Sequence, residues 1–193
     1  MRKIVVHEFI TLDGVIQAPG GPEEDTDGGF KHGGWSVPYW HDDMGADIGK
    51  AFEQADTLLL GRKTWQTHGE AFEPMTDDPF ADSMNAFKKY VVSTTLKTAD
   101  LWRNSTIISS NVMEEIGKLK EQSGKDILID GSSVLIHTLA ENDLIDEYSL
   151  HVHPLVLGDG KRLFPLGKRL DLKLVESKAF PTGVTHQLYQ VTR

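Results

Sequence analysis

The chain has 193 residues, of which 39% are hydrophobic and 25% charged, and this composition is typical of one soluble globular domain. Its 20 basic and 29 acidic side chains give a formal net charge of −9, and no basic run exceeds a pair, so nucleic acid is not an expected partner. Cysteine is absent, which excludes disulfides, thiolate catalysis and cysteine zinc sites. No apolar run is long enough for a membrane span and the start lacks a secretory signal, so we expect a cytoplasmic protein.

The chain begins with an apolar stretch that predicts a first strand within residues 1–14. Residues 17–35 follow, with six glycines, two prolines and four acidic residues. Glycine and proline disfavour regular structure, so we expect a long loop there. Such a loop is either functional or only a mobile surface excursion. We expect a lid that becomes ordered when ligands bind, with the acidic run at 23–25 left in solvent.

The middle of the chain alternates helix-like and strand-like segments. Apolar residues at helical spacing predict a helix over 44–55, with Asp42 or Asp43 as the N-cap. Short apolar runs predict buried strands at 57–61, 89–93, 105–109 and 126–130, and further helices are expected over 111–124 and 132–142. This alternation predicts a mainly parallel sheet with helices on both faces.

The last third reads as strands without helices between them, at 145–157, 171–179 and 184–192. These stretches should add antiparallel strands to the parallel sheet, so the prediction is a single α/β domain over residues 1–193 with a mixed sheet. The stretch 148–157 is more apolar than one face of a monomer's sheet requires. We therefore expect a homodimer that forms through the C-terminal strands.

One predicted strand end carries two cations. Gly61 ends an apolar strand, and Arg62, Lys63 and Thr64 then open a helix. A helix N-terminus offers unpaired N–H groups and a partial positive charge, which attract anions. The two cations add full charges, which suit a phosphate monoester such as the one on the ribose of NADP.

Two other strand ends carry small or hydroxyl residues: Gly131, Ser132 and Ser133 after the strand at 126–130, and Ser93, Thr94 and Thr95 after the strand at 89–93. Small residues let a pyrophosphate approach the backbone closely, and hydroxyls can donate hydrogen bonds to it. Open α/β sheets bind ligands at the carboxyl ends of their strands, so the three turns are expected to converge on one nucleotide. The alternative is that each turn merely starts a helix.

Competing motifs lack support. The chain has no G-x-x-x-x-G-K-[ST], G-x-G-x-x-G or G-x-S-x-G, which disfavours a P-loop, an ordinary Rossmann site and a serine hydrolase. His151 and His153 share a strand face at a spacing that can chelate a metal, but we expect a structural or interface role and no metal site. The adjacent Asp146 and Glu147 point to opposite faces of a strand and cannot form a catalytic pair.

Four stretches occur in the order seen in one superfamily, at residues 11–15, 59–65, 89–96 and 131–164. The chain resembles the dihydrofolate-reductase-like superfamily, in particular the reductase domain of bacterial riboflavin biosynthesis (the RibD C-terminal family), as a stand-alone member. The riboflavin enzymes commonly carry a Gly-Gly pair where this chain has Gly131 and Ser132. Their fused deaminase needs zinc-binding cysteines, which this chain lacks.

The resemblance implies NADPH as the hydride donor. It implies that residues 61–64 hold the ribose phosphate and residues 131–133 the pyrophosphate, and we expect further cofactor contacts from Gly14, Val15 and Leu135. The expected substrate is a small flat heterocycle, either pterin-like or a pyrimidine of the 5-amino-6-(5-phosphoribosylamino)uracil type. Two alternatives stay open: a dihydrofolate reductase-type enzyme, and a nucleotide-binding protein of the same fold without turnover.

Candidates for the substrate side are fewer. Asp13 is the expected catalytic group near the nicotinamide, although it can equally serve its own Asp-Gly turn. Trp35 and Tyr39 can wall a flat substrate, although core packing also explains such aromatics. In the superfamily a helix carboxylate can serve the substrate; Asp43 is our candidate, with Asp42, Asp47 and Glu53 also open.

Overall fold

A mixed sheet runs through the whole molecule in the computed structural model, which describes residues 1–164 and 167–193. The strands are β1 (Ile4–Thr11), β2 (Ala55–Gly61), β3 (Lys88–Val92), β4 (Ser105–Ile108), β5 (Asp126–Ile129), β6 (Glu147–His153), β7 (Asp171–Ala179) and β8 (Thr185–Thr192). The helices are α1 (Asp42–Glu53), α2 (Arg62–Phe72), α3 (Pro79–Ala86), α4 (Val112–Glu121) and α5 (Ser133–Glu141), with 3-10 turns η1 (Asp27–Gly29) and η2 (Val37–Tyr39).

The eight strands lie in the order β4-β3-β2-β5-β1-β6-β8-β7. The first six are parallel, whereas β8 pairs antiparallel with β6, and β7 pairs antiparallel with β8. The predicted fold class, an α/β domain with a mainly parallel sheet and antiparallel C-terminal strands, is therefore confirmed. Because β1, β2, β3 and β5 are parallel, the turns that follow them lie along one edge of the sheet.

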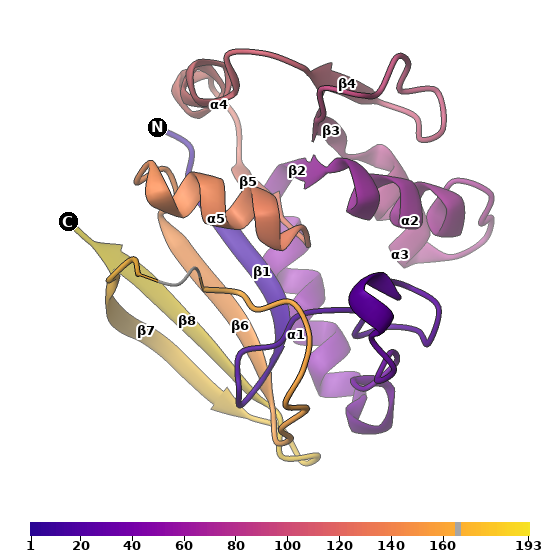
Figure 1. Cartoon of the computed structure of the whole chain (residues 1–193), viewed down its shortest axis with the longest axis vertical. Helices are drawn as coiled ribbons and strands as arrows, with labels where there is room; N and C mark the ends of the chain where they lie inside the picture. The colour runs from indigo at the N-terminus through magenta and orange to yellow at the C-terminus, as the bar shows by residue number, and fades with distance from the viewer. Residues whose placement is uncertain (165–166) are drawn as a thin grey trace.

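Helices cover both faces of the sheet, as predicted. In Figure 1 helix α5 lies in front of the sheet and α1 lies behind it. A hydrophobic core lies on each face of the sheet, and successive residues of β1 contribute to opposite cores. Ile4 and Val6 pack with α4 and α5, whereas Val5 packs with α1, α2 and α3. No helix in the two described ranges combines the length and apolarity that a membrane crossing needs.

Several element boundaries differ from those predicted. Helix α1 is capped by His41, whose Nδ1 accepts the N–H of Asp43 at 3.1 Å, so the predicted aspartate N-cap is wrong. The two aspartates lie instead in the first turn, where their charges favour the helix N-terminus. Helix α4 ends at Glu121 rather than at Gly124. Helix α3 was not predicted, although Asp78 caps it and Pro79 opens it.

The apolar stretch 148–157 has an explanation within one chain. Strand β6 pairs with β1 on one side and β8 on the other, and six of its seven residues are buried. An internal strand that is covered on both faces needs apolar residues on both. Within β6 one chain therefore accounts for the apolar residues, whereas Val156 beyond the strand is 66% exposed, and the homodimer stays a prediction.

The central position of β2 yields a prediction about stability. Leu59 has no exposed surface and packs in the core with α4 and α5. We expect Leu59→Ala to lower the free energy of unfolding by roughly 2–5 kcal/mol, because it removes buried methyl groups and leaves a cavity. Val134→Ala, at a side chain that is 74% exposed, should change it by less than about 0.5 kcal/mol. Urea denaturation measures both values, and similar small losses would contradict the core position of Leu59.

Candidate functional site

Two of the three predicted ligand-binding turns lie against each other at the carboxyl edge of the sheet. Strands β2 and β5 are neighbours, so the turn after each lies beside the other. A Cβ built on Gly61 would overlap the Ser132 hydroxyl, and one built on Gly131 would lie 2.7 Å from the Thr64 methyl. The side chains of Ser132 and Thr64 therefore occupy the space that a Cβ at Gly61 or Gly131 would need, so each glycine allows the facing turn to approach closely.

The third turn uses its hydroxyl locally. Ser93 is buried, and its Oγ accepts the backbone N–H groups of Thr95 at 3.2 Å and Leu96 at 3.1 Å. Thr94 and Thr95 are exposed. The Ser93 hydroxyl thus serves the shape of its own turn, and the two threonines are the hydroxyls of this turn that face solvent.

Ser132 holds a backbone conformation that L residues rarely adopt. Its φ is 90° and its ψ 88°, directly after Gly131 at φ 88°. Ser132 also precedes α5 without a side-chain cap, so the first N–H groups of that helix have no partner from it. Glycine would take this conformation without strain. An anion at this turn would meet the unpaired N–H groups and the positive end of α5.

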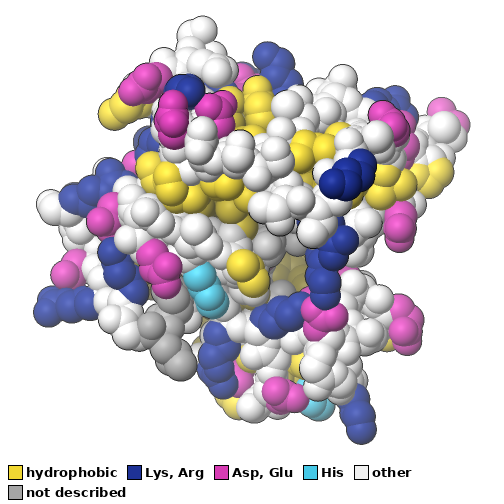
Figure 2. Space-filling view, turned by 45° about the horizontal axis from the view of Figure 1, so that its top comes forward, with side chains coloured by type: hydrophobic (Ala, Val, Ile, Leu, Met, Phe, Trp, Pro, Cys, Tyr) yellow, Lys and Arg dark blue, Asp and Glu magenta, His cyan; other side chains and the backbone are white. Residues whose placement is uncertain are grey.

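The predicted phosphate-binding cation already holds an anion from the protein itself. Lys63 forms an ion pair with Asp27 of the long loop, and Lys161 approaches the same carboxylate at 2.8 Å. Hydrogen bonds from Lys161 and then Lys63 lower the pKa of Asp27 to about 2. Arg62 is exposed and has no ion-pair partner in the described part of the chain. Figure 2 shows basic and acidic side chains next to one another around a hollow in this face of the molecule.

The loop over residues 17–35 is built around its own small core. Trp35 is buried and packs with Val15, Ala18 and Phe30, and its Nε1 donates a hydrogen bond to the Gln17 carbonyl at 2.8 Å. The tryptophan that was expected to wall the substrate therefore stabilises the loop. The 3-10 turn η1 is the regular structure that the loop contains.

The prediction that the acidic run stays in solvent is wrong for two of its three residues. Glu24 accepts the N–H of Gly20 at 2.6 Å, and its burial, more than any other factor, raises its pKa. Asp25 pairs with Lys161. Only Glu23 is exposed. The reason is local: short turns leave backbone N–H groups that a nearby carboxylate can satisfy.

Asp13 ties two loops together. Its carboxylate accepts the Thr11 hydroxyl at 2.6 Å and the backbone N–H groups of Leu157 and Gly158 at 3.3 and 2.8 Å. Burial opposes ionisation, but these hydrogen bonds outweigh it and lower the pKa of Asp13. At neutral pH this carboxyl is ionised, so it has no proton to donate.

The other expected cofactor contacts take varied positions. Gly14 has a φ of 85° and closes the turn after β1, with its N–H bonded to the Thr11 carbonyl at 3.0 Å. Val15 is fully buried in the loop core, and Leu135 is buried in the core under α5. Ser133 is half-buried at the start of α5.

Aromatic rings gather around His153 at the end of β6. The ring of Trp35 lies 5.0 Å from it and that of Tyr39 5.7 Å, both edge-on. Tyr39 is half-buried. Of these three rings, Tyr39 is the one with surface to offer a flat ligand.

The four helix carboxylates differ sharply in their exposure. Asp42, Asp43 and Glu53 are exposed, and the Asp43 side chain, 67% exposed, lies 3.6 Å from the His41 ring. Asp47 turns toward the sheet, where its side chain is 9% exposed. Asp43 thus lies in solvent in the first turn of α1, whereas Asp47 faces the sheet, and the substrate role of Asp43 stays a prediction.

Three ionisable side chains beside the two turns were not singled out from the sequence. Glu8 accepts the Gly131 N–H at 2.8 Å, and its burial raises its pKa well above the usual range. Asp130 lies 3.3 Å from the ring of His68; burial opposes its ionisation, but His68 and then His7 lower its pKa. A signal was present, because a charged residue within an apolar strand or at its end needs a partner.

Solved structures of known proteins share this architecture. A crystal structure of a pyrimidine reductase-like protein from Corynebacterium diphtheriae has a TM-score of 0.67 at 13% identity, covering 100% of this chain and 92% of that one. Dihydrofolate reductase from Enterococcus faecalis, complexed with NADP(H), has a TM-score of 0.61 at 17% identity, covering 99% and 97%. At these identities the likeness concerns the fold, which is dihydrofolate-reductase-like.

Sequence comparisons identify the family within the dihydrofolate-reductase-like fold. The family described as RibD C-terminal domain matches residues 2–186, and the chain belongs to that family. It is 34% identical over 196 residues to the Bacillus subtilis (strain 168) protein YyaP, covering 97% of this chain and 94% of that protein. The resemblance drawn from the motifs is thereby confirmed, and the family is one of reductases that use NAD(P)H.

The strained turn yields a prediction. Ser132→Gly should raise the free energy of unfolding by roughly 1 kcal/mol, because the relief of left-handed strain exceeds the added freedom of the unfolded chain. Ser133→Gly is the matched control: it lies within α5 and should lower that free energy by roughly 0.5–1 kcal/mol. Urea denaturation measures both changes. A loss of stability in Ser132→Gly would contradict the strain.

Proposed function

We propose that this protein is an NADPH-dependent reductase that transfers hydride to a small flat heterocycle, a pyrimidine of the 5-amino-6-(5-phosphoribosylamino)uracil type or a pterin-like compound. The observation that carries the proposal is the meeting of two glycine turns at the carboxyl edge of a parallel sheet. One of them carries Arg62 and Lys63 and the other opens α5. Membership in a family of reductases supports the same reaction class.

The residues present fit the phosphates of a dinucleotide. Lys63 and Lys161 already hold a carboxylate, that of Asp27, which is an anion in the place of a phosphate group. Arg62 adds a charge without an ion-pair partner in the described residues. The unpaired N–H groups that open α5 suit the pyrophosphate. When bound, the dinucleotide supplies the hydride; the chain's part is to bind, orient and shield.

Other side chains take positioning roles in this proposal. Asp13, being ionised and bonded to the 157–158 turn, holds the edge of the site in shape rather than supplying a proton. Tyr39 is the side chain that we assign to the face of the heterocycle. Gly14 allows the sharp turn that follows β1.

One experiment distinguishes the two forms of this proposal from each other and from a nucleotide-binding protein without turnover. The oxidation of NADPH is followed with a pyrimidine of the named type, with dihydrofolate, and with no acceptor, beside cofactor binding by nicotinamide fluorescence. Oxidation with the pyrimidine supports the pyrimidine form of the proposal, and oxidation with dihydrofolate alone supports its pterin form, that of a dihydrofolate reductase-type enzyme. Binding without oxidation across the panel favours a nucleotide-binding protein without turnover.

Cofactor choice gives a direct prediction. Wild-type protein should bind NADPH more tightly than NADH, because only NADPH carries the ribose phosphate. Arg62→Ala or Lys63→Ala should each weaken the binding of NADPH by about 1.5–3 kcal/mol, or roughly 10- to 150-fold, because a charge-assisted contact is lost. The affinity for NADH should stay unchanged. Fluorescence titration measures the affinities. Equal wild-type affinities for both cofactors would refute the phosphate assignment.

The ion pair between the loop and Lys63 gives a second prediction. A phosphate at Lys63 has to displace the Asp27 carboxylate, so Asp27→Asn should tighten NADPH binding severalfold, most strongly at low salt. Glu23→Gln removes an equal charge from the exposed part of the same loop and serves as the control. Equal effects of the two variants would show that only net charge matters.

A further inference from the structure

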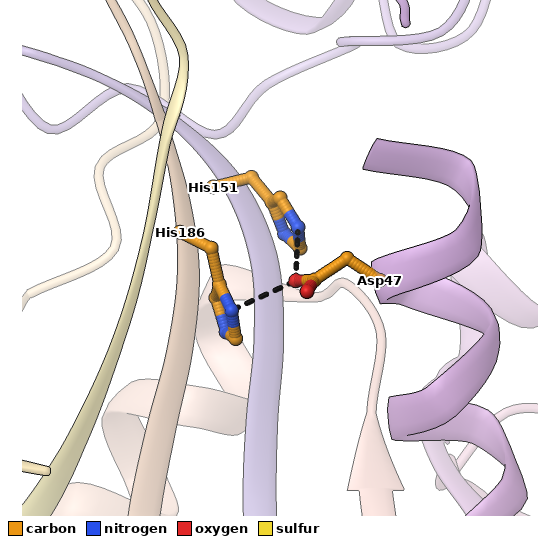
Figure 3. Close-up of side chains that lie close together, drawn as sticks. All are labelled: Asp47, His151 and His186. Atoms are coloured by element: carbon orange, nitrogen blue, oxygen red, sulfur yellow. Dashed lines mark ion pairs between the residues drawn. The ribbon is translucent and has the colours of Figure 1, made fainter. Parts of the chain in front are cut away.

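Three potential metal ligands meet on the α1 face of the sheet, outside the cofactor turns. They are Asp47 from α1, His151 from β6 and His186 from β8, segments far apart in the sequence whose side chains point toward one another in Figure 3. Asp47 Oδ2 lies 3.6 Å from His151 Nε2 and 2.8 Å from His186 Nδ1, and all three atoms lie within 4.8 Å of one another.

These atoms are buried and unsatisfied. The side chains of Asp47, His151 and His186 are 9%, 1% and 11% exposed. Neither ring nitrogen of His151 has a hydrogen-bond partner, and Asp47 Oδ2 and His186 Nδ1, although 2.8 Å apart, do not form an aligned hydrogen bond with each other. A buried polar atom without a partner is costly and rare in native proteins, so several in one place call for a missing partner. One bound cation would satisfy three of the four atoms.

We propose that Asp47, His151 and His186 bind one divalent transition-metal ion of the Zn²⁺ class. Bonds of about 2.0–2.2 Å in tetrahedral geometry place ligand atoms roughly 3.3–3.5 Å apart, within the range that these atoms span. Two imidazoles and a carboxylate suit zinc and its neighbours better than Mg²⁺ or Ca²⁺, which prefer oxygen ligands alone. This site is independent of the proposed reductase activity.

The surroundings support the ligand roles. His186 Nε2 lies 2.9 Å from the Ser149 hydroxyl, and donation there leaves the Nδ1 lone pair free for a metal. The two rings are stacked within 10° of parallel, so binding requires rotation about their soft Cβ–Cγ torsions.

Lys178 is the main competitor for the carboxylate. Its Nζ lies 3.2 Å from Asp47 Oδ1, the oxygen that the proposed metal does not use. This ion pair accounts for Asp47 Oδ1, whereas Asp47 Oδ2 faces only the two imidazoles, and the ring nitrogens of His151 have no hydrogen-bond partner. A lysine so close repels a second cation, so its removal is expected to tighten metal binding.

Bound metal would join α1 to β6 and β8 and so act as a structural clamp. A ligand that binds only the folded state stabilises it by mass action. Zn²⁺ at about a hundredfold excess over its dissociation constant should therefore raise the melting temperature by roughly 5 °C or more.

The test uses tag-free full-length protein, stripped with chelator and titrated with ZnCl₂ alone, with native mass spectrometry for stoichiometry. Co²⁺ serves as a spectroscopic probe, because its visible absorption reports imidazole coordination. Asp47→Asn and His186→Asn should abolish binding of the single equivalent, whereas His32→Gln, at an exposed histidine, should leave it intact. Circular dichroism checks that each variant is folded.

Lys178→Met keeps all three ligands and remains informative if the ligand variants fail to fold. It should tighten Zn²⁺ binding at least about fivefold. Three results would overturn the site: wild-type protein that binds no equivalent of Zn²⁺, folded Asp47→Asn or His186→Asn that binds it as tightly as His32→Gln, and Lys178→Met that binds it no more tightly than wild type.

Discussion

The absence of a side chain at Gly61 governs how the turns pack at the carboxyl edge of the sheet. Strands β2 and β5 are neighbours, and the turns that follow them pack closely because a glycine in each leaves room for a side chain of the other. Gly61 yields that space to Ser132, and Gly131 yields it to Thr64. The helix N-termini of α2 and α5 are thereby brought side by side, and two partial positive charges act on one place. Arg62 and Lys63 add full positive charge at the start of α2.

The long loop is coupled to that edge through charge rather than through apolar contact. Its own core around Trp35 gives it a shape, and Asp25 and Asp27 attach it to Lys63 and Lys161. A loop held in this way can exchange one anion for another at little cost, because Asp27 is exposed and its ion pairs compete with water. The glycines allow the shape, and the carboxylates decide where the loop rests.

The α1 face of the sheet carries an unusual number of buried polar groups. His7 lies beside His151, whose ring is stacked on His186, and Asp47 faces both of the latter. The opposite face, which α4 and α5 cover, is mostly apolar, and its buried polar groups include Glu8, Thr57 and the Tyr148 hydroxyl. The sheet thus separates a mainly hydrophobic core from a face with several buried polar side chains. Those polar side chains need hydrogen bonds or another partner, which apolar packing alone does not supply.

The sequence alone determined the strands, the parallel core of the sheet and the two glycine turns. Apolar runs that end in glycine are local patterns, and the packed structure agrees with them. The motifs also pointed to the family that the comparison confirmed. Tertiary structure decided which charges meet. The pairing of Asp27 with Lys63, the use of Asp13 as a tie between loops and the burial of β6 all join residues distant in the chain. The same holds for Asp47, His151 and His186: no spacing links them, because a helix and two strands bring them together only when the sheet has formed.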